Sequence, residues 1–338
     1  MTAPLPPLSI LDLALIGKGQ SVGEALNNSV RMAQEAERLG YSRVWYAEHH
    51  NMSSIGSSAT SVLIAHVAAH TSTIRLGSGG VMLPNHSPLV IAEQFGTLAE
   101  LHPGRIDLGL GRAPGTDQVT MRALRRNGQE ADHFPQDVQE LQGYLSDDTR
   151  ISGVNATPGR GTNVPIYILG SSLFGASLAA AFGLPFAFAS HFAPDSLESA
   201  LDIYRGRFEP SEQLAQPYVI AAANVIAADD EHEAQSQFTA VKRQRANLML
   251  AKGRHMSDEQ LDELLASPQG QYFLNMMRYT AVGTTKVVTD YLASFSEFTG
   301  ADELMVVHAS PGFAARLNSV ALLAEGAQLQ DPALHSVG

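Results

Sequence analysis

The sequence contains no cysteine, and only 17% of its 338 residues are charged. The absence of cysteine excludes disulfides, zinc–thiolate sites and catalysis by a thiol. The net charge of −12 argues against nucleic acids and anionic membranes as partners, because both would be repelled by an acidic surface. The composition and the net charge do not exclude a small organic substrate.

Long apolar runs and a targeting signal are also lacking. The amino-terminal segment MTAPLPPLSILDL has neither the basic region nor the apolar core of a signal peptide. The most apolar later stretch, residues 177–190, is too short to span a bilayer and is interrupted by Pro185. We therefore expect a cytoplasmic protein with no membrane partner.

The chain does contain a regular alternation of short β-rich runs with amphipathic helical stretches. Eight runs are typical of strands: residues 8–16, 42–50, 74–83, 105–113, 165–170, 185–190, 218–227 and 302–309. Each of them is followed by a stretch that predicts a helix. Eight such units in a chain of this length favour a single (β/α)8 TIM barrel domain over residues 1–338.

Two longer intervals interrupt this alternation. One follows strand 4 (114–164) and the other lies around the helix of unit 7 (251–282), and both are expected to be largely irregular insertions. A doubly wound open sheet is disfavoured, because its first strand would lead into a G-x-G-x-x-G turn. Here the first strand leads into LIGKGQS instead.

Glycines and polar residues gather where the expected strands end. In a barrel of this kind the carboxyl ends of the strands carry the active site. The residues concerned are Glu48, His49, His50, Gly79, Gly80, Arg112, Gly170, Ser171, Ser172, His191, Asn224 and His308. A pocket at this end would suit a flat, partly anionic guest.

Two of these groups allow more than one interpretation. Glycine inside a strand lowers stability unless the backbone must bend or be approached closely, so Gly79-Gly80 is either a barrel bend or a strained peptide beneath a planar ring. The serines after strand 5 either cap the next helix or, with its N–H groups, hold a phosphate. Arg112 on the neighbouring strand end favours the phosphate.

The Glu48-His49-His50 run also has several interpretations. Adjacent residues on a strand point to opposite faces, so the two histidines cannot easily share one metal, and no metal site is expected. A structural role at the rim is one alternative, and acid–base or hydrogen-bond chemistry at the pocket mouth is the other. His66 and His70, one helical turn apart, are expected on a helix surface or in a dimer contact.

Several segments, in this order, resemble the bacterial luciferase-like flavin monooxygenases over most of residues 8–309. They are VWYAEHH, IRLGSGGVMLPNHSPLVIAEQFGTL, HPGRIDLGLGRA, IYILGSS and FASHFAPD. The chain is most similar to the branch called luciferase-family oxidoreductase group 1. The resemblance implies a barrel that binds reduced FMN, delivered by a separate flavin reductase, and uses O2 to oxygenate a small organic substrate. It also implies a homodimer formed through the helices of units 2 and 3.

The resemblance further implies roles for individual residues. His49 matches the catalytic histidine of the family, while His50 leads into the loop and helps to shape the substrate side. Glu48 is expected to orient a neighbour by hydrogen bonding. Gly79-Gly80 matches a cis peptide beneath the isoalloxazine ring.

The phosphate site of the family is matched by Arg112, Gly170, Ser171 and Ser172. Two positions depart from luciferase: Gly111 replaces a cysteine, and Phe134-Pro135 aligns with a second phosphate arginine. FMN is therefore expected either to bind more weakly or to have its phosphate bound also by Arg122, Arg125 or Arg126. The interval 251–282 corresponds to the mobile lid of luciferase.

Two alternatives to the oxygenase function remain open. Some relatives use the deazaflavin F420 for hydride transfer instead of FMN. Others bind flavin without turnover, although the E-H-H run argues against that.

Overall fold

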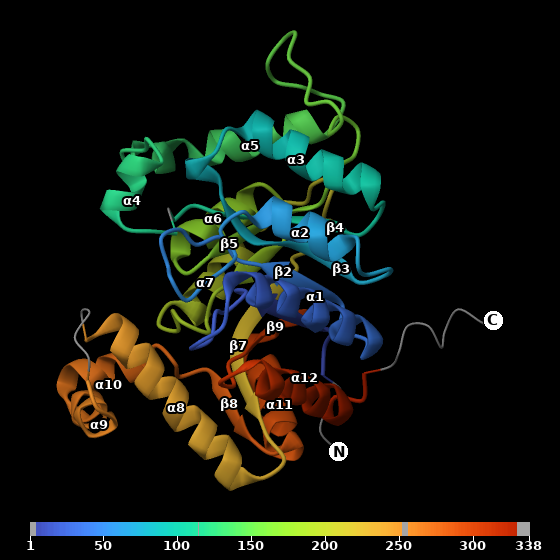
Figure 1. The fold of residues 1–338 in the computed structure, drawn as a ribbon. Coiled ribbons are helices and arrows are strands. Elements are labelled where there is room, and N and C mark those ends of the chain that lie inside the picture. The colour runs from blue at the N-terminus through green and yellow to red at the C-terminus, as the bar shows by residue number, and fades with distance from the viewer. Residues whose placement is uncertain (1–4, 114, 252–255, 330–338) are drawn as a thin grey trace.

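Parallel strands close into a ring in the structure, a computed structural model that describes residues 5–113, 115–251 and 256–329 (Figure 1). The strands in this part of the chain are β1 (Leu8–Asp12), β2 (Arg43–Tyr46), β3 (Arg75–Met82), β4 (Ile106–Gly111), β5 (Ile166–Gly170), β6 (Phe186–Phe188), β7 (Val219–Ala227), β8 (Thr280–Gly283) and β9 (Glu303–His308). Neighbouring strands pair in parallel in the order β1 to β7 and then β9, which pairs with β1 and closes the ring. The predicted (β/α)8 barrel is confirmed.

Helices surround the ring and follow most of the strands (Figure 1). The α-helices are α1 (Val22–Arg38), α2 (Thr60–Ala68), α3 (Pro88–Leu101), α4 (Gln118–Ala123), α5 (Phe134–Leu145), α6 (Leu173–Ala181), α7 (Leu197–Gly206), α8 (Glu231–Met249), α9 (Asp258–Ala266), α10 (Pro268–Asn275), α11 (Thr285–Thr299) and α12 (Phe313–Gly326). Two short 3-10 helices, η1 (Leu83–Asn85) and η2 (Gln129–His133), lie between them.

The interval 251–282 is more ordered than the sequence predicted. It contains α9, α10 and most of β8, which pairs with the carboxyl-terminal part of β7 and lies outside the ring. The expectation of an irregular segment was therefore wrong for the described part, while residues 252–255 lie outside the described residues. These elements are only four to nine residues long, which is too short for a clear apolar period.

The first strands are shorter than predicted, and polar contacts explain where they end. The Asp12 carboxylate accepts hydrogen bonds from the Ala14 N–H at 2.9 Å and the Ser29 hydroxyl at 2.6 Å. Ala14 then takes a φ of 49°, which a strand cannot continue. The next strand, β2, ends at Tyr46, so the histidine pair lies in the loop beyond it rather than on the strand.

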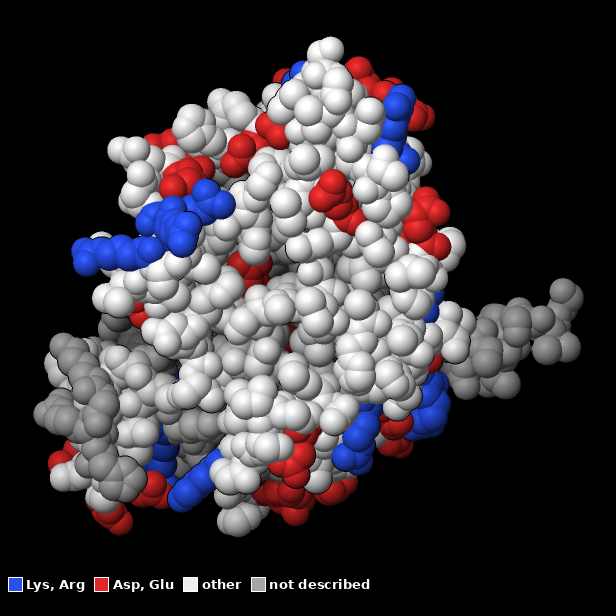
Figure 2. Space-filling view, turned by 45° about the horizontal axis from the view of Figure 1, so that its top comes forward, with Lys and Arg blue, Asp and Glu red and all other residues white. Residues whose placement is uncertain are grey.

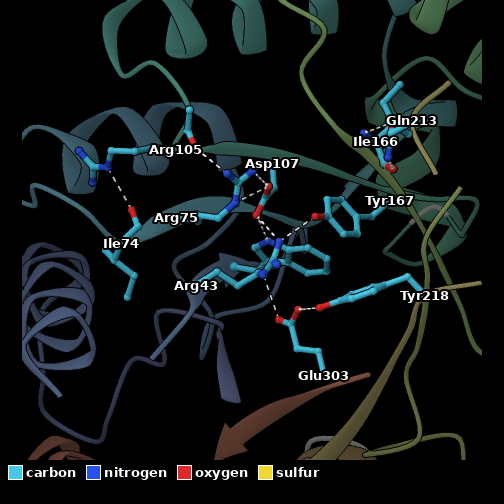
Figure 3. A network of polar contacts seen from close by, with 12 residues as sticks. Arg43, Ile74, Arg75, Arg105, Asp107, Ile166, Tyr167, Gln213, Tyr218 and Glu303 are labelled. Atoms are coloured by element: carbon cyan, nitrogen blue, oxygen red, sulfur yellow. Dashed lines mark hydrogen bonds and ion pairs between the residues drawn. The ribbon is translucent and has the colours of Figure 1, made fainter. Parts of the chain in front are cut away.

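A network of charged and aromatic side chains fills the barrel at the amino-terminal ends of its strands (Figure 3). Arg43 lies 2.8 Å from the Asp107 carboxylate and 2.9 Å from that of Glu303. The hydroxyl of Tyr218 donates to Glu303, and Arg43 donates to the hydroxyl of Tyr167, both at 2.8 Å. Burial alone would lower the pKa of Arg43, but the two carboxylates raise it above its ordinary value. Paired charged side chains therefore fill the barrel interior at the amino-terminal ends of its strands.

The surface carries charges of both signs. Figure 2 shows acidic and basic side chains dispersed over the face drawn, with uncharged residues between them. Within the described ranges, no helix combines the length and the apolar character that crossing a membrane requires.

Candidate active site

A cavity of about 880 Å³ lies at the carboxyl ends of the strands. This volume falls within the range of roughly 300–1,000 Å³ that is usual for small-molecule sites. Its walls come from the barrel strands and from α8 and α10, and they are mainly apolar. Large apolar side chains in the wall include Leu11, Trp45, Phe134, Phe188, Phe273, Met276 and Met305.

Most of the residues singled out in the sequence meet at this cavity. Those that line it are His49, Gly79, Gly80, Arg112, Gly170, Ser171, Ser172 and His191. His50 is not among the lining residues. The described residues contain no cluster of three or more acidic or histidine side chains able to hold a metal ion.

Glu48, just after β2, accepts hydrogen bonds from residues at the end of β3 and beyond it. Its buried carboxylate accepts hydrogen bonds from the ring N–H groups of His50 and His86, each at 2.8 Å. It also accepts the Met82 N–H at 3.0 Å. Burial alone would raise the pKa of Glu48, but the hydrogen bonds, above all those from the two histidines, lower it to about 2. Glu48 therefore orients His50, and His50 turns away from the cavity.

His49 faces the cavity from the loop after β2. Its backbone N–H donates to the Ser57 carbonyl at 3.1 Å, and the His50 N–H donates to that of Gly115 at 3.3 Å, so both sides of the turn are held. The His49 Nδ1 atom is buried and has no hydrogen-bond partner among the described residues. Burial lowers the pKa of His49, which keeps the ring neutral near pH 7. A neutral imidazole can donate or accept a proton there.

His191, just after β6, lies near His49. Burial, the charge of Arg245 and that of His49 lower the pKa of His191 to about 3. Its Nδ1 is likewise buried and unpaired within the described chain. Two neutral imidazoles therefore face the same cavity.

The peptide between Gly79 and Gly80 is cis, as predicted, and both residues line the cavity. The register of β3 against β4 also shifts between Ser78 and Val81, so the barrel bends at this point. A Cβ on Gly79 would lie 2.8 Å from Leu11 Cδ1, and one on Gly80 would lie 2.8 Å from the Gly109 carbonyl oxygen. Close strand packing thus requires glycine here, and the bend that was one of the two interpretations is observed.

Arg112 and the start of α6 form a second polar corner of the cavity. The Arg112 side chain is exposed and stacks on Phe174, with its guanidinium carbon 4.1 Å from the ring centroid. Ser172 occupies the N-cap of α6, but its side chain makes no capping hydrogen bond within the described residues. The capping interpretation is therefore not observed, and the first-turn N–H groups of α6 remain available to an anion.

The three arginines expected to share the phosphate do not line the cavity: Arg122, Arg125 and Arg126. Arg126 donates to the Asn85 backbone carbonyl at 3.1 Å instead. Phe134, at the position of the second luciferase arginine, is buried in the cavity wall.

Sequence reasoning missed His86 as the second partner of Glu48, and Arg245 as a residue of the cavity. His86 follows β3 in a short polar turn, which carries no pattern of its own. Arg245 had a weak signal, because Val241, Arg245 and Leu248 are spaced to share one face of α8, and all three line the cavity.

Comparison with known proteins identifies the family. The family model described as luciferase-like monooxygenase matches residues 7–302. The chain belongs to this family. The family places it among the flavin-dependent oxidoreductases of the monooxygenase type, in agreement with the resemblance seen in the sequence.

Individual family members match along nearly the whole chain. A luciferase-like monooxygenase from Escherichia coli (strain K12) is 48% identical over 326 residues, which cover 95% of this chain and 97% of that protein. N-acetyl-S-alkylcysteine monooxygenase from Bacillus subtilis (strain 168) is 35% identical and covers 82% of this chain and 85% of its own. The crystal structure of apo-MsnO8 matches with a TM-score of 0.87 at 34% identity, covering 96% of this chain and 98% of that one.

More distant structures share the fold alone. The oxygenating constituent of 3,6-diketocamphane monooxygenase in complex with FMN has a TM-score of 0.72 at 17% identity and covers 95% of this chain and 97% of its own. An F420-dependent secondary alcohol dehydrogenase has a TM-score of 0.66 at 14% identity and covers 97% and 100%. The barrel alone therefore does not distinguish FMN from F420.

Proposed function

We propose that this protein is the oxygenase of a two-component system, which binds reduced FMN delivered by a separate flavin reductase and oxygenates a small organic substrate with O2. The observation that carries the proposal is that one cavity brings together the His49 ring, the Gly79-Gly80 peptide and the Arg112 corner. Reduced FMN, when bound, supplies the electrons that activate O2.

The residues present fit such a cofactor. Arg112 has no carboxylate partner among the described residues, and it lies beside the first turn of α6, which is uncapped by a side chain. A guanidinium next to a helix amino terminus suits a phosphate. The cis Gly79-Gly80 peptide offers a surface without side chains for a planar ring. The apolar remainder of the cavity excludes water from the reacting atoms.

His49 would hold the proton that the oxygenation needs. Its ring is neutral and lines the cavity, and its unpaired Nδ1 is covered by the protein, so the ring would exchange a proton with a bound molecule through its other nitrogen, Nε2. His50 cannot share this role from its position, because its ring is bound to Glu48. Glu48 instead fixes the turn that presents His49.

The relatives suggest a first substrate class to test. The N-acetyl-S-alkylcysteine monooxygenase of Bacillus subtilis, by its name, acts on a thioether. A cavity wall containing Met82, Met249, Met276, Met277 and Met305 would adapt to an unbranched, polarizable group of that kind. Thioethers therefore belong in a substrate panel beside ketones, aldehydes and sulfonates.

A homodimer through α2 and α3 is part of the proposal. Val62 on α2 is 68% exposed, and Val90 on α3 is 43% exposed. His66 on α2 and His70, just after its end, are also exposed. Sedimentation equilibrium of the protein and of a Val62→Glu variant tests this surface. A dimer that the substitution does not weaken would place the interface elsewhere.

The cofactor and the role of His49 are tested together. Titration with reduced FMN and reduced F420 comes first, and tighter binding of F420 would replace the oxygenase proposal by hydride transfer. Stopped-flow oxidation of the pre-reduced complex then compares His49→Ala with His50→Ala. We expect His49→Ala to keep its fold and its affinity for reduced FMN, but to slow oxygenation by about 10²–10⁴-fold and to release hydrogen peroxide.

His50→Ala is the matched control, because it removes an adjacent imidazole that does not line the cavity. Its oxygenation rate should fall clearly less. Normal turnover by His49→Ala together with failure of His50→Ala would mean that the two roles are reversed.

A further inference from the structure

The cavity wall is cationic, although the protein is acidic. Among the described residues, no aspartate or glutamate lines it, while three arginines do: Arg112, Arg245 and Arg316. The chain as a whole has a net charge of −12. A cavity wall with three arginines and no carboxylate among its described residues, in an acidic protein, favours binding of more than one anionic group.

Arg245 stands out because no described residue forms an ion pair with it. Its only side-chain hydrogen bond among the described residues runs from Nη2 to the Asn224 Oδ1 atom, at 3.2 Å. Asn224 is itself held by its amide, which donates to the His191 carbonyl at 2.7 Å. Arg243, two residues earlier on α8, pairs with Asp258 at 2.8 Å and also with Asp262 on the outside of the molecule. The acidic partners near α8 are therefore directed away from the cavity.

The positions of the other two arginines in the cavity wall are explained by other groups. Arg112 lies at the phosphate corner. Arg316 shares a water-sized space of about 10 Å³ with Asp12 and His308, and the Asp12 charge partly opposes the lowering of its pKa by burial. For Arg245, burial lowers the pKa and no carboxylate opposes it. A partly buried cation without a counter-charge is costly unless a ligand supplies one.

We propose that Arg245 binds a carboxylate of the organic substrate, so that the substrate is a small organic acid with an apolar body. A planar guanidinium can hold a carboxylate through two parallel hydrogen bonds. Asn224 fixes one edge of the guanidinium and leaves the others for the ligand. The apolar body would lie against the neighbouring wall, which contains Phe192, Leu248, Met249, Phe273 and Met276. This inference rests on the proposed function for the identity of the ligand as substrate.

The test measures binding rather than turnover. Trp45 is the single tryptophan of the chain and lines the cavity, so its fluorescence reports occupancy without any cofactor. Hexanoate and hexanamide form a pair of probes with the same body and a different charge. We expect hexanoate to bind the unmodified protein at least about tenfold more tightly than hexanamide. Arg245→Gln should remove this preference by weakening hexanoate about 10–100-fold and leaving hexanamide unchanged.

Two matched variants make the result specific. Arg243→Gln removes a charge from the same helix outside the cavity and should keep the preference for the acid. Arg245→Lys should restore part of it, because the charge returns without the planar fork. Equal binding of acid and amide by the unmodified protein, no binding of the acid, or equal losses in Arg243→Gln and Arg245→Gln would each overturn the proposal.

A parallel titration with reduced FMN and riboflavin separates this inference from the proposed function. If the acid preference depends on Arg245 while reduced FMN fails to bind, the anion site stands and the cofactor proposal falls. If reduced FMN binds and the acid preference is absent, only the anion site falls. A selective loss of reduced FMN over riboflavin in Arg245→Gln would assign Arg245 to the cofactor phosphate and would also overturn the proposal.

Discussion

Replacing Glu48 by glutamine should destabilise the protein by about 3 kcal/mol near pH 6, and the loss should shrink as the pH falls. Glu48 is 1% exposed and accepts hydrogen bonds from His50, His86 and the Met82 N–H. Glutamine keeps the shape of the side chain but removes the charge. The half-buried imidazole donors then lose their charged acceptor.

The magnitude follows from the pKa of the carboxyl group. A fall from the ordinary 4.5 to about 2 corresponds to about 3 kcal/mol of stability, at about 1.4 kcal/mol for each factor of ten. Because the pKa is lowered in the folded state, this contribution is complete above pH 4.5 and is lost as the pH falls towards 2. The pKa of His50 is raised, chiefly by its hydrogen bond to Glu48, so its contribution is complete below pH 6.5 and is lost at higher pH. The difference between the two proteins should therefore be largest at about pH 5–6.5.

Urea unfolding of both proteins between pH 3 and pH 8 measures this difference. Between pH 6 and pH 3 it should decrease by about 2 kcal/mol. Glu35→Gln is a suitable control, because Glu35 pairs with the exposed Arg38 on the surface of α1, and its loss should be below about 1 kcal/mol. A difference for Glu48→Gln that stays constant over the whole range would refute the reasoning, since it would show that the charge of Glu48 is not what stabilises the turn.

Two further changes test the two ends of the barrel. Asp107→Ala leaves Arg43 and Arg75 without their shared carboxylate, so we expect a loss of about 3–5 kcal/mol in urea unfolding; a loss below 1 kcal/mol would show that the network contributes nothing. Arg112→Ala should weaken reduced FMN by about 1.5–3 kcal/mol in calorimetry, and riboflavin much less. Equal losses of affinity for both ligands would show that Arg112 does not bind the phosphate.

The sequence predicted the barrel well, because its signal is repeated. Seven of the eight expected strand runs contain a strand that begins within one residue of the predicted start, and the eighth, 8–16, begins at Leu8 as predicted. The ends were less accurate where a single side chain decided them. The stop of β1 at Asp12 depends on contacts with Ala14 and Ser29, and the contact with Ser29 spans seventeen positions, which no local period can reveal.

The candidate site was predictable where it depended on backbone and on position at a strand end. Glycine in an apolar strand marked the Gly79-Gly80 peptide, and the end of β4 marked Arg112. The role of Arg245 could not be predicted in the same way. We infer its significance from the lack of a carboxylate partner among the described residues, and the spacing of residues along the chain does not show which charges lie around a side chain in the folded protein.

Charged side chains are paired with one another at one end of this barrel and lack carboxylate partners among the described residues at the other. The paired end stabilises the fold, and the unpaired end is where we propose that ligands bind. At the amino-terminal ends of the strands, Arg43 lies between Asp107 and Glu303, and each carboxylate accepts further hydrogen bonds. Arg75 also pairs with Asp107, so two cations balance two carboxylates there without a ligand. At the carboxyl ends, Arg112 and Arg245 face a mostly apolar cavity whose described wall contains no carboxylate. Arg112 is exposed to solvent, but Arg245 is partly buried, and a partly buried cation without a counter-charge lowers stability unless a bound anion supplies one.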